Sequence, residues 1–218
     1  MSKGREKMGS LRNPVKYTYD DLLTFPDDGL RREIIDGELY VTPSPATPHQ
    51  IVVGNLYYLL RSYLTAHPVG RILLAPLDVV FSQFDVVEPD LLFVSTARRD
   101  VVTTKNIQGS PDLAIEVLSP GTRRTDETTK RRLYERFDVL EYWLIDVKIE
   151  AVKIYRRSAT GVPFDRIGEY TVEAGDHVAS PLFPDLQVSL AAIFQDLQTA
   201  PRRPSAKVAP SRAGSIIR

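Results

Sequence analysis

The chain has 218 residues, of which 43% are hydrophobic and 26% are charged, as expected for a globular protein with one well-buried domain. It has no cysteine, which excludes disulfide bonds, thiolate metal sites and cysteine nucleophiles. The N-terminus is polar and basic, unlike a signal peptide, and no apolar run reaches the length of a membrane span. We therefore expect a cytoplasmic protein without a membrane partner.

The total charge is zero, but it is distributed unevenly along the chain. Residues 1–16 carry a net charge of +4 and residues 199–218 carry +5, which leaves −9 on residues 17–198. The second tail is also rich in Pro, Ser and Ala, a composition typical of disorder. We expect basic, disordered tails at 1–16 and 199–218 around a single domain at 17–198. The alternative is that the tails are arms that contact nucleic-acid phosphates.

The first predicted elements are a short helix and a β-hairpin. Thr18 is a suitable helix cap, because its hydroxyl can accept a backbone N–H and acids follow it in the first turn. Residues 32–41 form two short strand-like runs around Asp36-Gly37, a pair that favours a two-residue hairpin turn. Asp36 and Gly37 are therefore interpreted as turn formers.

A long helix is predicted to start at Thr47. Thr47 can cap it, Pro48 fits its first position, and Gln50 completes a capping box. The apolar residues that follow have helical spacing and form one face: Val52, Leu56, Leu59, Leu60 and Tyr63. Pro68 and Gly70 end the helix.

The remaining chain alternates between apolar β-type runs and helices. Strands are expected at 71–77, 79–81, 86–94, 113–118, 141–146, 152–156, 170–172 and 187–190. A second helix is expected at 125–137 and a short closing helix at 191–197. This order predicts an α/β fold with a mixed β-sheet flanked by helices, an N-terminal hairpin and C-terminal β additions.

Two acids lie inside apolar predicted strands, where charged side chains are uncommon. Asp90 stands between Glu88-Pro89 and an apolar run, and Glu116 interrupts another. A lone buried carboxylate loses several kcal/mol of solvation, so a partner must compensate it. A divalent cation bound by both acids would do so, and Mg²⁺ prefers such oxygen ligands. The alternative is that Asp90 marks a strand end and Glu116 pairs with an arginine.

Lys130 is the third candidate. On the predicted second helix it shares one stripe with Asp126, Tyr134 and Phe137, and the aromatic residues would hold this stripe against the sheet. The lysine would then lie toward the ends of the strands. The alternative is an ordinary ion pair between Asp126 and Lys130 on the helix surface.

An ordered series of motifs resembles the Uma-two (Uma2) family of the PD-(D/E)xK nuclease superfamily. The resemblance covers about 17–195 and lies in segments 17–22, 33–38, 43–45, 88–91, 111–120 and 141–146, together with His49, Lys130 and Tyr134. It implies a restriction-endonuclease-like fold in which Asp90 and Glu116 bind Mg²⁺, with Mn²⁺ able to substitute. The superfamily lysine two residues after the second acid is Leu118 here, and the resemblance points to Lys130 as its replacement.

The resemblance also implies a function. The expected protein is a metal-dependent endonuclease that hydrolyses phosphodiester bonds, with DNA as the expected substrate and Asp90, Glu116 and Lys130 as catalytic residues. Action on RNA, or on a branched or damaged substrate, is an alternative that the sequence does not separate from it. Glu33 and His49 match family positions and are auxiliary candidates. By analogy the protein would form a homodimer. The alternative is a weak or inactive nuclease-fold protein that binds nucleic acid or another partner.

Overall fold

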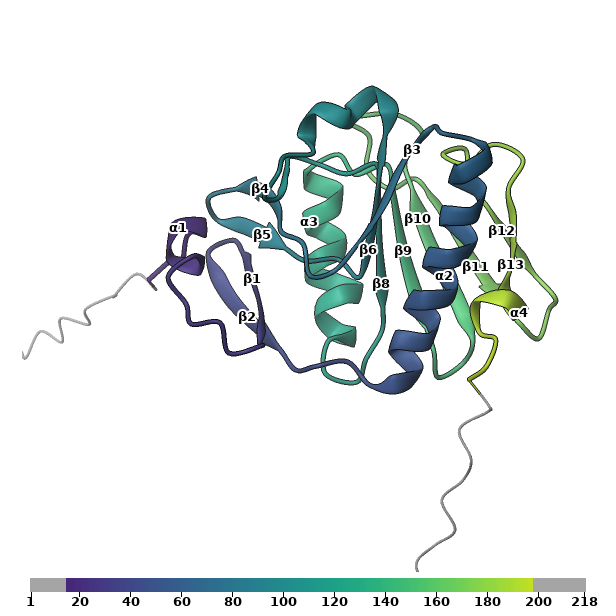
Figure 1. Ribbon diagram of the computed structural model, residues 1–218, viewed down its shortest axis with the longest axis horizontal. Coiled ribbons are helices and arrows are strands. Elements are labelled where there is room, and N and C mark those ends of the chain that lie inside the picture. The colour runs from purple at the N-terminus through teal and green to yellow at the C-terminus, as the bar shows by residue number, and fades with distance from the viewer. Residues whose placement is uncertain (1–14, 198–218) are drawn as a thin grey trace, which may run out of the picture.

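The computed structural model describes residues 15–197 (Figure 1). The predicted tails, 1–16 and 199–218, lie outside this range apart from Val15 and Lys16. No helix within the described range is long and apolar enough to cross a membrane.

A six-stranded sheet forms the centre of the structure, in the order β11-β10-β9-β8-β6-β3. Its strands are β3 (Gly70–Leu74), β6 (Leu91–Ser95), β8 (Leu113–Val117), β9 (Glu141–Asp146), β10 (Ala151–Arg156) and β11 (Arg166–Thr171). β8 and β9 are parallel, and every other neighbouring pair is antiparallel. The expected mixed sheet is therefore present, and its two central strands, β8 and β9, are buried along their whole length.

A smaller sheet has the order β2-β1-β5-β4-β7. Its strands are β1 (Arg31–Ile35), β2 (Glu38–Thr42), β4 (Val79–Ser82), β5 (Asp85–Val87) and β7 (Ile107–Gln108). Asp36 and Gly37 join β1 to β2 with positive φ angles of 54° and 81°, the backbone that a tight hairpin turn requires. The predicted hairpin is confirmed. Helix α1 (Tyr19–Leu22) begins at Thr18, whose hydroxyl accepts the Asp21 N–H as predicted.

Helices cover both faces of the large sheet (Figure 1). Helix α2 (Thr47–Ala66) packs on one face together with α4 (Leu190–Ile193) and the ribbon of β12 (His177–Ala179) and β13 (Gln187–Ser189). The six-residue π-helix η2 (Thr125–Lys130) continues directly into α3 (Arg131–Arg136) on the other face, where the small sheet also packs. A 3₁₀ helix, η1 (Thr96–Val101), follows β6.

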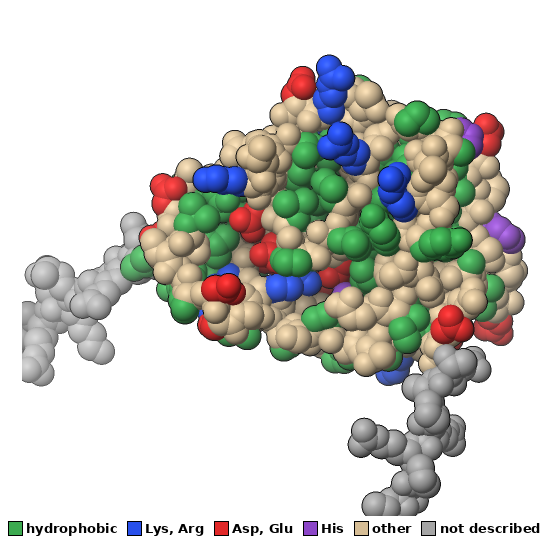
Figure 2. Space-filling model, in the orientation of Figure 1, with side chains coloured by type: hydrophobic (Ala, Val, Ile, Leu, Met, Phe, Trp, Pro, Cys, Tyr) green, Lys and Arg blue, Asp and Glu red, His purple; other side chains and the backbone are tan. Residues whose placement is uncertain are grey.

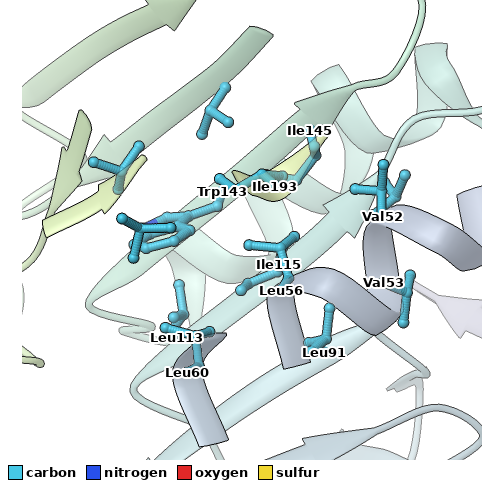
Figure 3. Close-up of a cluster of buried hydrophobic side chains, with 14 of the residues drawn as sticks. Val52, Val53, Leu56, Leu60, Leu91, Leu113, Ile115, Trp143, Ile145 and Ile193 are labelled. Atoms are coloured by element: carbon cyan, nitrogen blue, oxygen red, sulfur yellow. The ribbon is translucent and has the colours of Figure 1, made fainter. Parts of the chain in front are cut away.

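The alternation of side chains in β6 and β8 explains how one sheet serves two cores. Leu91 and Ile115 pair across the strands and pack with α2, where Leu56 and Trp143 join the same cluster (Figure 3). Leu92 and Ala114, the next pair, pack on the opposite face with α3 and the small sheet. Strands that are buried on both faces need apolar residues at nearly every position, which is the pattern in the sequence.

The predicted strand at 86–94 is wrong, because the segment divides into two strands of different sheets. β5 belongs to the small sheet and β6 to the large one, and Glu88-Pro89-Asp90 connects them. Pro89 has no N–H for a strand ladder, which suits a connection between sheets. Asp90 therefore lies just before β6, at the junction of the two sheets.

Other predicted boundaries also differ. The cap of α2 is Ala46, and no side chain caps this helix, so the predicted Thr47–Gln50 capping box is absent. β3 ends at Leu74 rather than at 77, and the predicted strand at 170–172 corresponds to the longer β11. The predicted strand at 152–156 corresponds to β10, which is hydrogen-bonded on both sides and is therefore not an edge strand.

Helix α2 should contribute strongly to stability through Leu56, which is fully buried. Leu56→Ala should lower the free energy of unfolding by about 2–5 kcal/mol, because it removes buried apolar surface and leaves a cavity. Tyr58→Ala on the same helix is the control, since Tyr58 is 70% exposed and its change should stay within about 0.5 kcal/mol. Urea unfolding followed by circular dichroism measures both, and equal losses would contradict this packing.

Candidate functional site

A cavity of about 220 Å³ with several charged lining residues lies where the two sheets approach one another. The hairpin's exit loop, the start of α2, the ends of β6 and β8, and the start of η2 form its wall. Figure 2, in the orientation of Figure 1, shows acidic, basic and histidine side chains close together near the centre of the visible face. Its charged lining residues are Arg31, His49, Asp90, Glu116, Asp126 and Lys130.

Asp90 and Glu116 reach this cavity because β6 and β8 are antiparallel neighbours. Leu91 pairs with Ile115, so one step further along both strands places Asp90 opposite Glu116. Opposed residues of an antiparallel pair point to the same face of the sheet. The carboxylate of Asp90 also accepts the backbone N–H of Val117 at 2.9 Å, which fixes it beside Glu116. The structure therefore brings together the two acids that the sequence singled out.

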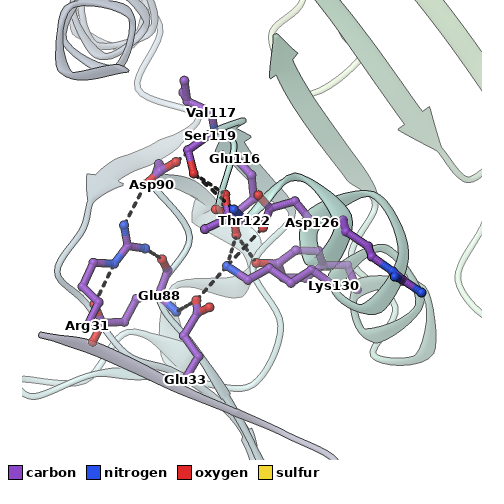
Figure 4. Close-up of polar contacts among 12 residues, drawn as sticks. Arg31, Glu33, Glu88, Asp90, Glu116, Val117, Ser119, Thr122, Asp126 and Lys130 are labelled. Carbon is purple, nitrogen blue, oxygen red and sulfur yellow. Dashed lines mark hydrogen bonds and ion pairs between the residues drawn. The ribbon is translucent and has the colours of Figure 1, made fainter. Parts of the chain in front are cut away.

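Three donors hold the Asp90 carboxylate, and Figure 4 shows the contact from Arg31. Arg31 Nη1 donates to Oδ1 at 3.0 Å, and His49 Nε2 lies 3.0 Å from Oδ2, which also accepts the Val117 N–H. Burial would raise the pKa of Asp90, but the hydrogen bond and charge of His49, the charge of Arg31 and the Val117 N–H outweigh it and lower the pKa to about 2. Asp90 is ionised at neutral pH.

Glu116 has a different environment. Its Oε1 accepts hydrogen bonds from Lys130 Nζ at 2.9 Å and from the Tyr134 hydroxyl at 2.9 Å, and the side chain is buried. Burial raises the pKa of Glu116 to about 8; Lys130 opposes this rise, whereas the nearby carboxylates of Asp126, Asp90 and Glu33 add to it. The cavity thus places one firmly ionised acid beside one that retains a proton more readily.

Lys130 links the two sheets. Its Nζ donates to Glu33 Oε1 on β1 at 2.8 Å and to Glu116 Oε1 on β8 at 2.9 Å, and it lies 3.7 Å from Asp126 Oδ1. Burial would lower the pKa of Lys130, but the charges of Glu116, Glu33 and Asp126 raise it, so the lysine is charged. Asp126 and Lys130 are both buried, which contradicts the alternative of an ion pair on the helix surface.

The π-helix η2 presents this group of side chains to the sheet. Both of its buried residues, Asp126 and Lys130, point toward the cavity, and Tyr134 follows on α3. Single π-turns inside longer helices are often found at functional sites. The predicted stripe is therefore confirmed for these three residues, whereas Phe137 stacks on Phe81 away from the cavity.

The auxiliary candidates also lie at the site. Glu33 Oε1 accepts hydrogen bonds from Lys130 Nζ and from the backbone N–H of Glu88. His49 Nε2 contacts Asp90 Oδ2. The sequence reasoning gave no role to Arg31, although Arg31 and Glu33 are two residues apart on β1 and therefore face the same side. That spacing is the signal from which Arg31 could have been found.

Several other polar residues lie elsewhere. Asp112 is buried and accepts the Ser95 N–H at 2.6 Å, outside the cavity lining. His67 and His177 are exposed. Leu118, at the position of the usual lysine, is buried in the core on the α3 side. Lys130 is the only described lysine that lines the cavity.

The residues at the cavity suit a hard divalent cation. Asp90 and Glu116 would supply oxygen ligands, and the buried Asp126 Oδ1 has no hydrogen-bond partner among the described residues. No group of three His, Asp or Glu side chains within residues 15–197 is already arranged around a common point. Mg²⁺ is usually bound by one or two carboxylates and keeps several waters, so this donor set fits Mg²⁺ better than an ion that needs a full protein cage.

The raised pKa of Glu116 predicts how stability depends on pH in a metal-free buffer. The folded state binds this proton up to about pH 8, whereas an unfolded glutamate releases it near 4.5. The stabilising contribution is therefore complete below about pH 4.5 and is lost as the pH rises through about 8. We expect Tm to fall from pH 5 to pH 9, as differential scanning fluorimetry would show.

Glu116→Gln tests the origin of this fall. The variant should reduce the fall without abolishing it, because burial also raises the pKa of Glu88 to about 7. Glu127→Gln, at an exposed position, is the control and should leave the pH profile unchanged. A Tm that is independent of pH in the wild type would contradict the assignment.

Comparison with known proteins supports the same fold. A solved structure described as a "putative nuclease belonging to DUF820 from Anabaena variabilis ATCC 29413" superposes with a TM-score of 0.68. The alignment has 23% identity and covers 81% of this chain and 97% of that one, which confirms the predicted α/β fold. No curated protein matches the chain. The family model called Uma2, described as "Putative restriction endonuclease", matches residues 19–192, and the chain belongs to this family.

Proposed function

We propose that this protein is a metal-dependent endonuclease that hydrolyses phosphodiester bonds in DNA. The observation that supports it most directly is the meeting of Asp90, Glu116 and Lys130 in one cavity, from two strands and the helix that follows them. Membership of a family described as restriction endonucleases supports the reaction class. Mg²⁺, with Mn²⁺ as a substitute, is proposed from the donor set.

The two acids would have separate tasks in holding the ion. Asp90 is ionised, and His49 and the Val117 N–H orient it through Oδ2, so it is the acid that is already in the charge state of a ligand. Glu116 would complete the site after losing its proton, because a carboxylate must be ionised to ligate a metal. When bound, the ion would lower the pKa of a water molecule and screen the negative phosphate.

Lys130 would act through its charge. A lysine that stays protonated cannot accept a proton from the attacking water, but it can stabilise the negative charge that develops on the phosphate. Glu33 holds the ammonium group from the side opposite Glu116 and so keeps it directed at the cavity. The role proposed for Lys130 is therefore electrostatic.

The first test is cleavage of a supercoiled plasmid with Mg²⁺ or Mn²⁺, compared with EDTA. Asp90→Asn and Glu116→Gln keep the size of each side chain and should each lower the cleavage rate by at least about 10²-fold, the scale of losing a preorganised charge at a reaction centre. Asp112→Asn is the control, since Asp112 is buried outside the cavity. Wild-type rates in both site variants would overturn the assignment.

The second test concerns Lys130. Lys130→Met should lower cleavage strongly, whereas Lys148→Met, at an exposed position, should leave it unchanged. Because Lys130 neutralises buried acids, its removal should also lower Tm, so rates are compared at a temperature where both variants are folded. Equal activity of the two variants would remove Lys130 from the site.

Metal binding tests the alternative that the protein is an inactive nuclease-fold protein that only binds nucleic acid or another partner. A protein that only binds nucleic acid, with Leu118 in place of the usual lysine, should show no Mn²⁺ binding that depends on Asp90. Calorimetric titration of the wild type and of Asp90→Asn distinguishes the two functions.

A further inference from the structure

The guanidinium of Arg31 makes three contacts with the connection between the two sheets, Glu88-Pro89-Asp90. Its Nη1 donates to Asp90 Oδ1 at 3.0 Å, its Nη2 donates to the backbone carbonyl of Glu88, and its Nε lies 3.4 Å from Glu88 Oε2. The guanidinium therefore spans the whole Glu88-Pro89-Asp90 connection (Figure 4). Its side chain is 22% exposed, so it is held but can be reached by solvent.

These contacts place a positive charge beside Asp90 Oδ1, which accepts no other hydrogen bond from residues 15–197. His49 and the Val117 N–H both contact Oδ2, whereas Arg31 contacts Oδ1. Two cations cannot share this oxygen without strong repulsion at close range. A divalent ion that binds Asp90 must therefore compete with the guanidinium, while His49 and Val117 can keep the carboxylate oriented.

A displaced Arg31 side chain would have space to move. Arg31, His49, Asp90 and Pro45 line the first cavity and also a second one of about 400 Å³, so these four residues form the wall between the two cavities. The backbone of Arg31 is fixed in β1, where it pairs with Thr42. The guanidinium can thus leave Asp90 while remaining at the boundary of both cavities.

A phosphate is the ligand that best fits a released guanidinium at this position. The second cavity is lined by the acids Asp27 and Glu88 as well as Asp90, and Arg31 is the only lysine or arginine among its described lining residues. Glu116 and Asp126 line the first cavity, beside Lys130. A polyanionic substrate needs a cation here, and arginine binds phosphate oxygens through two parallel hydrogen bonds. The bound form of the site would then have the ion on Asp90 and Arg31 on the substrate.

We propose that Arg31 is a displaceable counterion of Asp90, which neutralises the carboxylate in the free protein, gives way to the divalent cation and then binds a substrate phosphate. The inference rests on the proposed function, because it needs both the ion and a phosphodiester. It makes metal binding and nucleic-acid binding favour one another, a coupling that is reciprocal in equilibrium affinities.

The experiment is calorimetric titration of Mn²⁺ into the full chain without nucleic acid. Arg31→Met should bind Mn²⁺ about tenfold more tightly than the wild type, a change within the usual range of coupling between sites. Arg32→Met is the matched control, because the neighbouring Arg32 pairs with Asp28 outside both cavities, and its Mn²⁺ affinity should be unchanged. Arg31→Lys keeps the charge and should stay close to the wild type.

Thermal melting provides a second measurement, which can still be made if Arg31→Met is less stable than the wild type. Removing Arg31 leaves Asp90 with less neutralisation, so this variant should melt lower than the wild type without metal. Mn²⁺ should then raise its Tm by more than it raises that of the wild type, because the ion replaces the missing charge. In Ca²⁺, the affinity of Arg31→Met for a short DNA duplex should be about tenfold weaker, as loss of a charged hydrogen bond predicts.

The outcomes separate this inference from the proposed function. If the wild type binds Mn²⁺ through Asp90 but Arg31→Met binds it no more tightly and gains no larger shift in Tm, Arg31 is a structural residue and only this inference fails. Unchanged DNA affinity in Arg31→Met would overturn its role in phosphate binding. If the wild type shows no Mn²⁺ binding that depends on Asp90, both proposals fail.

Discussion

The buried ammonium group of Lys130 is the interaction on which the architecture of the site depends. It joins Glu33 of the small sheet to Glu116 of the large sheet, through atoms that are only 2.8–2.9 Å apart. All three side chains are buried, so each lost most of its hydration on folding and has to be satisfied inside the protein. The position of the small sheet relative to the large one is therefore tied to the position of the candidate catalytic residues.

Arg31 makes a second link between the sheets, of a different kind. Lys130 is enclosed by its acidic partners, whereas Arg31 is partly exposed and lies in the wall between two cavities. Lys130 therefore links the two sheets in addition to its proposed electrostatic role, whereas Arg31 occupies a position that an incoming ion would need. Buried ion pairs add little net stability when the cost of desolvation is included, so their presence here is better explained by the chemistry of the site than by folding.

The excess of acids at the site accounts for its electrostatic character. Glu33, Asp90, Glu116 and Asp126 surround Lys130 and Arg31, and the buried acids cannot all be ionised without further positive charge. The protein meets this constraint by keeping Asp90 ionised with three donors and by raising the pKa values of Glu116 and Asp126. A bound divalent cation would neutralise the same excess of negative charge. The affinity for the metal and the free energy of unfolding should therefore both depend on pH.

Local patterns in the sequence were sufficient for most elements and for the central acids. The Asp36-Gly37 turn, the apolar face of α2 and the acid within the apolar run of β8 depend on neighbours a few residues apart, and such short-range constraints are visible in the chain itself. The same spacing predicted that Asp126, Lys130 and Tyr134 share a face. The predicted boundaries were less accurate, as at the start of α2, where the cap is Ala46, and at the end of β3, which is Leu74.

Only the tertiary structure decided which partners the charged residues have. Glu33 and Lys130 are 97 residues apart in the chain, and Arg31 and Asp90 are 59 apart, so no local pattern can pair them. In the segment 86–94, Pro89 marks a break in the strand, but no local pattern shows that the two halves belong to different sheets, because both halves are apolar and buried. The sequence by itself determined which residues are unusual, and the folded chain determined how their charges are balanced, since that balance depends on burial and on distances across the two sheets.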